Sequence, residues 1–214
     1  MAGTRHTVMK PRRWVASVLL LWSALAGCDG AVPTEQSNGD AVQLELHAIQ
    51  RQALDGSDHR PIPSMTDEVT VLIFSASDCP VANGYAPEIR AIRSDYVNRG
   101  VRFYLVNVES NTPVEALIKH AAEYDLPGPI LLDQDHALAA LVGAEVTPEA
   151  VVLRPGGEIA YRGRIDDQHR QLGARRPAAT RTELRDALDS VLAGHPVAVP
   201  RTAAVGCFIE DWAN

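Results

Sequence analysis

A short apolar strand that leads to a cysteine is the feature that most constrains the fold. Residues 69–74 form a run of apolar and β-branched side chains, as in a buried strand. Small polar residues follow and lead to Cys79, after which Tyr85, Ile89 and Ile92 recur with helical spacing. The pattern therefore predicts a buried strand that delivers a thiol to the start of a helix.

The position of Cys79 has a chemical consequence. Free N–H groups at a helix start, together with the positive end of the helix dipole, stabilise a thiolate, which is the reactive form of cysteine. Asp78 directly precedes the thiol and acts in the opposite direction, because a negative neighbour raises the pKa of a thiol. The residues alone leave the sign of the net pKa shift open.

The rest of the chain alternates between strand and helix patterns. We expect strands from about residue 42 and at 101–108, 129–132, 150–153 and 158–164, and helices at 86–98, 112–124, 136–142 and 180–192. Thr112-Pro113 and Asp135 are expected to cap the second and third of these helices. Strands joined through helices run parallel, whereas the Pro155-Gly-Gly turn adds an antiparallel hairpin. The order predicts an α/β domain with a mixed central sheet and helices on both faces.

Two segments resemble the thioredoxin superfamily. Phe74-Ser-Ala-Ser-Asp-Cys79-Pro80 resembles its active-site turn, most closely in the secreted redoxin-type branch, and Val146-Thr147-Pro148 is similar to its cis-proline loop. The resemblance covers about residues 42–194 and implies a thioredoxin-like three-layer sandwich. It also implies a cis Thr147–Pro148 bond next to Cys79, with Pro80, Thr147 and Pro148 contacting the substrate. Ala82 stands where a thioredoxin carries its second cysteine, so the two-cysteine motif is absent.

The N-terminal residues have the pattern of an export signal. Residues 1–27 combine a basic start with a short apolar run and small residues at the end, which is typical of a signal peptide. Leu25-Ala-Gly-Cys28 resembles a bacterial lipobox, in which the cysteine becomes the lipidated first residue. We therefore expect lipidation at Cys28, anchoring in a membrane and a periplasmic location, and Asp29 resembles an inner-membrane retention signal. The alternative is an ordinary signal peptide with an incidental cysteine.

The mature chain is expected to have three parts. Residues 28–41 form a polar tether, 42–194 the thioredoxin-like domain, and 195–214 an extended tail whose apolar residues should lie against that domain. Removal of residues 1–27 takes away four basic residues and changes the formal charge from −7 to −11. Such an acidic chain is not expected to bind nucleic acid.

Cys79 and Cys207 remain once Cys28 is assigned to lipidation, and they admit several functions. In the favoured one, Cys79 attacks a disulfide of a protein or small-molecule substrate, and Cys207 resolves the product in place of the missing second cysteine at Ala82. A permanent Cys79–Cys207 disulfide in a redox-inert binding module is a second interpretation.

A third interpretation is a peroxiredoxin-like peroxidase, but Ala76 and Leu72 stand where that family has Thr or Ser and proline. A copper site is a fourth, although no ligand spacing supports it. We expect no metal, and no cofactor either, since no phosphate loop or dinucleotide fingerprint occurs.

Other polar residues are expected to have structural roles. Asp133, Asp135 and His136 fit a strand end and a helix cap. We expect Asp166-Asp167 and His169 to be solvated or to form turns, and Arg175-Arg176-Pro177 to be exposed.

Overall fold

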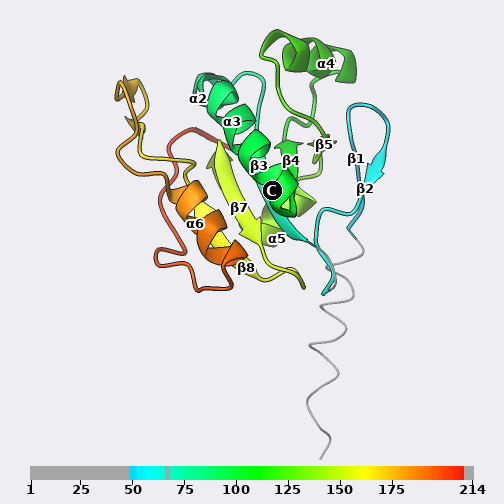
Figure 1. The fold of residues 1–214 in the computed structure, drawn as a ribbon. Coiled ribbons are helices and arrows are strands. Elements are labelled where there is room, and N and C mark those ends of the chain that lie inside the picture. Colours follow the sequence, from blue (N-terminus) through cyan, green and yellow to red (C-terminus); the bar gives the residue numbers. More distant parts are fainter. Residues whose placement is uncertain (1–48, 66–67, 210–214) are drawn as a thin grey trace, which may run out of the picture. The chain divides into compact units, whose positions relative to one another are not determined.

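The central sheet of the protein has five strands in the order β5-β4-β3-β7-β8 (Figure 1). The structure, a computed structural model, describes residues 49–65 and 68–209. The signal peptide, the lipobox, the tether, the strand expected from residue 42 and residues 210–214 of the tail lie outside the described residues.

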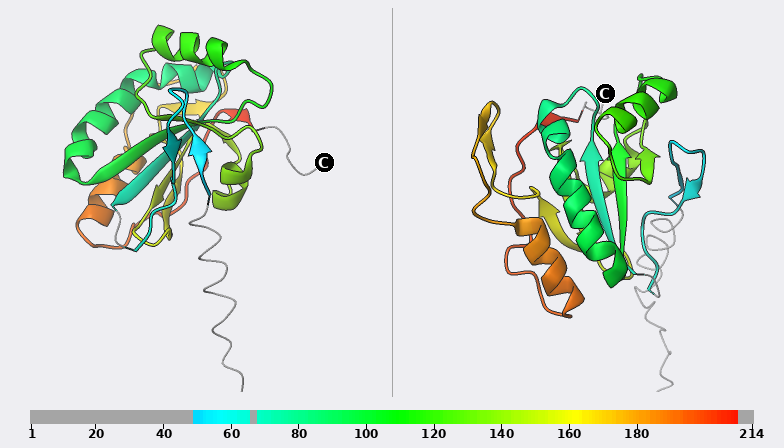
Figure 2. Two further views of the ribbon diagram at one scale, coloured as in Figure 1. Left: turned by 90° about the vertical axis from the view of Figure 1, so that its right-hand side faces the viewer. Right: turned by 45° about the horizontal axis from the view of Figure 1, so that its top comes forward.

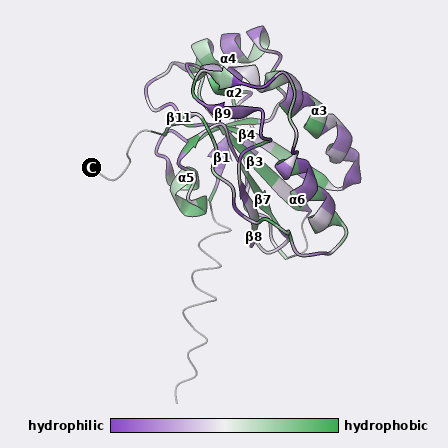
Figure 3. Ribbon diagram, turned by 90° about the vertical axis from the view of Figure 1, so that its left-hand side faces the viewer, coloured by the Kyte–Doolittle hydropathy of each residue, from purple (hydrophilic) through white to green (hydrophobic). Residues whose placement is uncertain are grey.

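The sheet is mixed, as the order of elements predicted. Strand β3 (Val69–Ser75) pairs in parallel with β4 (Val101–Asn107), which pairs in parallel with β5 (Ile130–Leu132). On the other side β3 pairs antiparallel with β7 (Glu149–Leu153), which forms the expected hairpin with β8 (Ile159–Gly163). All residues of β3 and β7 are buried, which is why both strands are mostly apolar and show no alternation of apolar and polar residues. The central strands are accordingly green in the hydropathy view of Figure 3.

Helices cover both faces of this sheet. They are α2 (Pro80–Gly84), α3 (Ala86–Tyr96), α4 (Val114–Glu123), α5 (Ala137–Val142) and α6 (Glu183–Leu192). In the left view of Figure 2, α3 and α6 lie on one side of the sheet and α5 on the other. Arg185 of α6 joins α6 to α3 through ion pairs with Glu88 and Asp95. The predicted thioredoxin-like α/β architecture is confirmed.

Three pairs of very short strands were not predicted. Strands β1 (Arg51–Gln52) and β2 (Asp58–His59) flank a turn at Asp55-Gly56, and β9 (His169–Gln171) pairs with β10 (Ala174–Arg175). The third pair joins β6 (Val146–Thr147) to β11 (Cys207–Phe208) in the C-terminal tail. Strands of two or three residues are too short to show alternation in a sequence.

The helix starts differ from the expected ones in three places. Helix α4 begins at Val114 with Pro113 as its N-cap, because the Thr112 hydroxyl donates to Glu109 and does not cap the helix. Helix α5 begins at Ala137, and its first turn is held mainly by the buried carboxylate of Asp133. That carboxylate accepts from the N–H groups of Leu138 and Ala139, whereas Asp135 accepts only from Ala137. Helix α6 begins at Glu183, since the side chain and N–H of Thr180 bond to Asp167.

Among the described residues, none of the helices is long and apolar enough to cross a membrane.

Candidate active site

The sheet topology brings the Cys79 turn and the proline loop to one edge. In the antiparallel pair β3–β7, Phe74 lies opposite Glu149, so the end of β3 and the start of β7 meet. Cys79 follows β3, and Thr147 and Pro148 precede β7. The Cys79 thiol donates a hydrogen bond to the carbonyl oxygen of Thr147 at 3.0 Å, and the Thr147–Pro148 bond is cis, as predicted.

Cys79 is the N-cap of α2 and its side chain is completely buried. Its sulfur accepts a hydrogen bond from the backbone N–H of Ala82 at 3.5 Å, and Pro80 occupies the first helical turn with its ring exposed. Ala82, which replaces the second cysteine of the thioredoxin motif, is also buried. The thiol therefore lies at a helix start, as expected, but other residues cover it completely from solvent.

The C-terminal tail supplies part of that cover, and with it the second thiol. Strand β11 runs antiparallel to β6 with Cys207 opposite Thr147, and the Thr147 hydroxyl donates to the Cys207 carbonyl at 3.5 Å. Both cysteines are free thiols, and the pairing of Cys207 with Thr147 brings the Cys207 side chain near enough to Cys79 to change its pKa. The tail lies against the domain at Cys207 and Ile209, as expected, whereas Phe208 is 85 % exposed. The right view of Figure 2 shows the tail, in red, running from α6 toward α2.

The two thiols have opposite pKa shifts. Burial raises the pKa of Cys79, but hydrogen bonds from the Cys207 thiol, the Thr147 side chain and the N–H groups of Ala82 and Cys207 outweigh burial and lower it. Burial, the hydrogen bond to Cys79 and repulsion by Cys79 and Asp78 raise the pKa of Cys207 to about 11. The sign left open by the residues is thereby settled: Cys79 is the more acidic thiol of the pair.

Glu109 organises the turn before Cys79 and was not anticipated. It follows β4 and accepts from the N–H and hydroxyl of Ser77 at 2.7 and 2.8 Å, from Asn107 at 2.7 Å and from Thr112 at 2.9 Å. Burial raises the pKa of Glu109, but these hydrogen bonds outweigh it and lower the pKa. The signal available in the sequence was its position, since the carboxyl ends of the parallel strands β3 and β4 meet at one edge.

A cavity of about 220 Å³ opens beside Cys207, between the tail and the loop after β4. Its lining includes Asp78, Glu109, Thr147, Cys207 and Phe208. Both charged side chains in this lining are acidic, and Phe208 is 85 % exposed. A substrate that approaches the cysteines from this side meets an acidic wall and an exposed aromatic ring.

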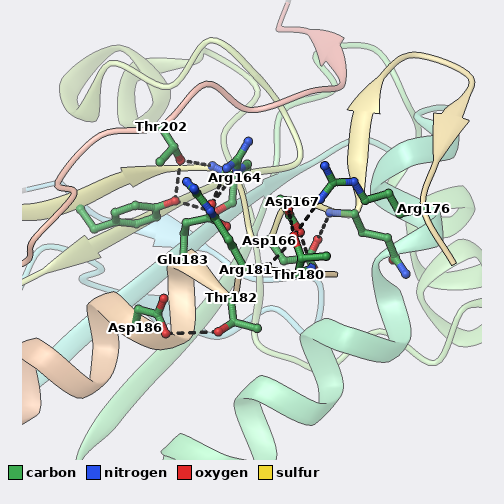
Figure 4. A network of polar contacts seen from close by, with 12 residues as sticks. Arg164, Asp166, Asp167, Arg176, Thr180, Arg181, Thr182, Glu183, Asp186 and Thr202 are labelled. Carbon is green, nitrogen blue, oxygen red and sulfur yellow. Dashed lines mark hydrogen bonds and ion pairs between the residues drawn. The ribbon is translucent and has the colours of Figure 1, made fainter. Parts of the chain in front are cut away.

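The segment after β8 supports the helix that follows Cys79. The Tyr85 hydroxyl donates to the carboxylate of Asp166 at 2.6 Å, and the ring of His169 lies 5.0 Å from that of Tyr85. Asp167 accepts from the N–H groups of Thr180 and Arg181 and forms an ion pair with Arg176 (Figure 4).

Asp166 and Asp167 are buried and accept hydrogen bonds from the N–H groups of Gln168, Thr180 and Arg181, so of the two expected roles the turn-forming one holds and the solvated one does not. Arg176 is only partly exposed, because it pairs with Asp167, whereas Arg175 is exposed as expected. The described residues contain no group of three or more histidine, cysteine or acidic side chains arranged to hold a metal ion.

The fold is thioredoxin-like, with Cys79 in the turn that follows β3. Residues 47–179 match the Redoxin family, and the chain belongs to that family. It has no match among curated proteins.

Solved structures show the same fold. An uncharacterised conserved protein of Geobacillus kaustophilus has 26 % sequence identity and a TM-score of 0.66, over 78 % of this chain and 89 % of that chain. A hypothetical protein of Sinorhizobium meliloti 1021 has 21 % identity and a TM-score of 0.62, over 78 % and 92 % of the two chains. A secreted disulfide oxidoreductase of Mycobacterium tuberculosis, described as homologous to Escherichia coli DsbE, has 20 % identity and a TM-score of 0.50, over 68 % and 97 %.

Proposed function

We propose that the protein is a thiol–disulfide oxidoreductase in which Cys79 is the nucleophile and Cys207 the resolving thiol. The observation that carries the proposal is the pairing of Cys207 with Thr147, whose carbonyl oxygen accepts from the Cys79 thiol, together with the lowered pKa of Cys79 and the raised pKa of Cys207. At neutral pH this difference favours the thiolate on Cys79, which is the form that attacks disulfides.

The proposed reaction has two exchange steps. The Cys79 thiolate attacks one sulfur of a substrate disulfide; a Cys79–substrate disulfide forms and the other substrate sulfur leaves as a thiolate. Cys207 then loses its proton to solvent and attacks the Cys79 sulfur, so that a Cys79–Cys207 disulfide forms and the second substrate thiolate leaves. The substrate gains two electrons, and an external dithiol that reduces the Cys79–Cys207 disulfide returns the protein to its starting state.

Substrate contacts are proposed for Pro80, Thr147 and Pro148. Pro80 follows Cys79 and is exposed, and the Thr147 carbonyl contacts the Cys79 thiol, an arrangement that favours protein disulfides in extended segments and also admits small disulfides. The oxidoreductase description of the Mycobacterium tuberculosis relative is consistent with such substrates, although at 20 % identity that relative supports the fold alone.

We also propose that the chain is exported and tethered through Cys28, with residues 1–27 removed, residues 28–41 as the tether, residues 42–194 as the domain and residues 195–214 as the tail. The lipobox-like Leu25-Ala-Gly-Cys28 supports the tether, and Asp29 favours the inner membrane. Incorporation of an alkyne-labelled fatty acid into the wild-type chain, and its loss in Cys28→Ser, is the expected result. Labelling that persists in Cys28→Ser rules out this anchor.

Trapping of mixed disulfides tests the proposed chemistry. Cys207→Ser leaves Cys79 able to attack but removes the resolving thiol, so disulfide-linked adducts should accumulate on non-reducing gels of expressing cells. Cys79→Ser keeps Cys207, whose raised pKa and position in the tail make it a poor nucleophile, so adducts should be absent.

The matched control is Cys79→Ser combined with Cys207→Ser, which measures adducts that form through any other cysteine. If Cys207→Ser yields no more adduct than this double variant, Cys79 is not an exchange nucleophile and the proposed function is wrong.

A further inference from the structure

The tail occupies a strand edge directly beside Cys79. Val146 and Thr147 of β6 pair with Phe208 and Cys207 of β11 in a sheet of two strands. When β11 is absent, the backbone groups of this edge have no strand partner, and such an edge is a ready template for another extended chain.

Close approach of the tail to this edge depends on a glycine. A Cβ atom built on Gly206 would lie 1.8 Å from the carbonyl oxygen of Thr147, so no other residue fits here while β11 is paired. Gly206 directly precedes Cys207, and the glycine therefore allows the sulfur to reach Cys79.

The tail is held at Thr202 and, beyond β11, at Ile209, which is buried and donates its N–H to the Glu145 carbonyl at 3.0 Å. The N–H of Thr202 donates to the Arg162 carbonyl at 3.1 Å, and its hydroxyl bonds to Tyr161 at 2.7 Å and to the N–H of Arg164 at 3.1 Å. Figure 4 shows Thr202 against Arg164. Beyond it, residues 203–208 are partly or fully exposed, and β11 has only two residues. Detachment of residues 206–209 therefore breaks the Ile209 contact with Glu145 but leaves the anchor at Thr202 in place.

A groove continues from the same edge. It has a volume of about 670 Å³, and its lining includes Val146, Leu172, Val205 and Phe208. Leu172 is 63 % exposed, and together with Val146 it offers apolar surface that remains when residues 206–209 detach.

We propose that the edge of Val146 and Thr147 is one strand-pairing surface shared by two mutually exclusive occupants, the residues 206–209 of the tail and an extended segment of a second polypeptide. A partner that pairs with this edge displaces Cys207 from Cys79, and return of the tail displaces the partner. The inference rests on the proposed function for its biological meaning, since redocking would couple the attack of Cys207 to release of the product.

Two measurements on the full chain test this competition without requiring exchange activity. Gly206→Val places a branched side chain against the Thr147 carbonyl and should keep β11 undocked. Ala203→Val is the matched control, because it adds similar bulk to an exposed position of the same tail. The first readout is alkylation of Cys79 by iodoacetamide, followed by peptide mapping. The second is binding of a labelled synthetic peptide of residues 203–209 that carries serine at the cysteine position.

Gly206→Val should increase both the alkylation rate of Cys79 and the affinity for the peptide by about tenfold or more, since the internal competitor is removed. Ala203→Val should behave like the wild type in both readouts. Equal peptide affinity in wild type and Gly206→Val, or an unchanged alkylation rate, overturns the proposal. Faster alkylation without peptide binding also overturns it, because the tail would then cover Cys79 without competing for a binding edge.

These outcomes are separate from those of the trapping experiment. A chain that forms no mixed disulfides can still show tail displacement and peptide binding, in which case the proposed function fails and the shared surface stands. Circular dichroism of both variants checks that the domain remains folded.

Discussion

Thr147 contacts both cysteines of the pair: its carbonyl oxygen accepts from the Cys79 thiol, and its backbone pairs in register with Cys207. A single residue of the proline loop thus sets the position of the buried thiol and of the thiol in the tail. The electrostatic state of each thiol consequently depends on the presence of the other.

The Cys207 side chain should lower the pKa of Cys79 measurably. Its hydrogen bond is the largest of the effects that oppose burial, so Cys207→Ala should raise the pKa of Cys79. Because only the thiolate is alkylated, the pH profile of Cys79 alkylation should have its midpoint below 9.0 in the wild type and move to higher pH in the variant. Peptide mapping after iodoacetamide treatment between pH 5 and about pH 10 follows this range.

Cys207→Ser is the control for this shift, because a serine hydroxyl can still donate a hydrogen bond and should raise the pKa less. A midpoint that is the same in wild type and Cys207→Ala would show that the tail thiol does not stabilise the Cys79 thiolate.

The hydrogen bonds of Glu109 should stabilise the fold in a pH-dependent way. Glu109→Gln weakens the bonds to Ser77, Asn107 and Thr112 and should cost about 1–3 kcal/mol in the free energy of unfolding at pH 7. The folded-state pKa of Glu109 lies below its ordinary 4.5, so the carboxylate's contribution is present above that value and is lost as the pH falls through the folded pKa.

Urea denaturation of both chains at pH 7 and near pH 3 measures this difference. The difference in the free energy of unfolding between wild type and Glu109→Gln should be smaller at the lower pH. A difference of the same size at both values of pH would mean that the ionised carboxylate is not the cause.

The Tyr85 hydroxyl should contribute to stability through Asp166. Tyr85→Phe removes the 2.6 Å bond and leaves a buried carboxylate with fewer donors, at a cost of about 1–3 kcal/mol. Tyr104→Phe is the control, since that buried tyrosine contacts His59 through its ring, which the substitution keeps. Loss of the Tyr104 hydroxyl should therefore cost less than about 0.5 kcal/mol. Chemical denaturation at neutral pH compares them, and equal losses would contradict the role of the hydrogen bond.

Asp133 and Asp135 provide a contrast between a buried and an exposed partner of Arg51. Asp133 also accepts from the first turn of α5 and is completely buried, so Asp133→Asn should lose about 2–4 kcal/mol. The Asp135 side chain is 67 % exposed, and Asp135→Asn should lose less than about 1 kcal/mol. Thermal unfolding separates the two variants, and a larger loss at Asp135 would be inconsistent with this assignment.

The parts of the fold that sequence reasoning predicted are those with long, regular patterns. The buried runs at β3, β4 and β7 and the apolar face of α6 each extend over five or more residues, enough for periodicity to distinguish strand from helix. The Cys79 turn and the Thr147–Pro148 loop were predicted from a resemblance, because their chemistry lies in local motifs.

The interactions that could not be predicted join residues far apart in the chain through single contacts. The pairing of Cys207 with Thr147 involves two residues on each strand, and the bond between Ser77 and Glu109 depends on the alignment of two parallel strands. Asp166 and Asp167 looked like solvated loop residues because their partners, Tyr85 and Arg181 among them, lie elsewhere in the sequence. Only a three-dimensional arrangement shows which donors reach them.

The reduction potential of the cysteine pair should depend on Gly163, which like Gly206 lets the tail pack closely against the domain. A Cβ atom on Gly163, which has φ of +153°, would lie 2.5 Å and 2.9 Å from the backbone oxygen and nitrogen of Thr202. Gly163→Ala should therefore loosen the tail and reduce the effective concentration of Cys207 at Cys79. A less stable Cys79–Cys207 disulfide has a less negative potential, by about 30 mV for each tenfold drop in effective concentration.

The potential is measured by equilibration in glutathione or dithiothreitol buffers. Gly173→Ala is the matched control: its φ of +77° gives comparable backbone strain, but a Cβ there meets no other atom within 4 Å. For an exchange-active pair the wild-type value should fall between roughly −270 and −120 mV, whereas a permanent structural disulfide lies below about −300 mV. A wild-type potential below that limit favours the structural interpretation, and an equal shift in both glycine variants shows that docking of the tail does not set the potential.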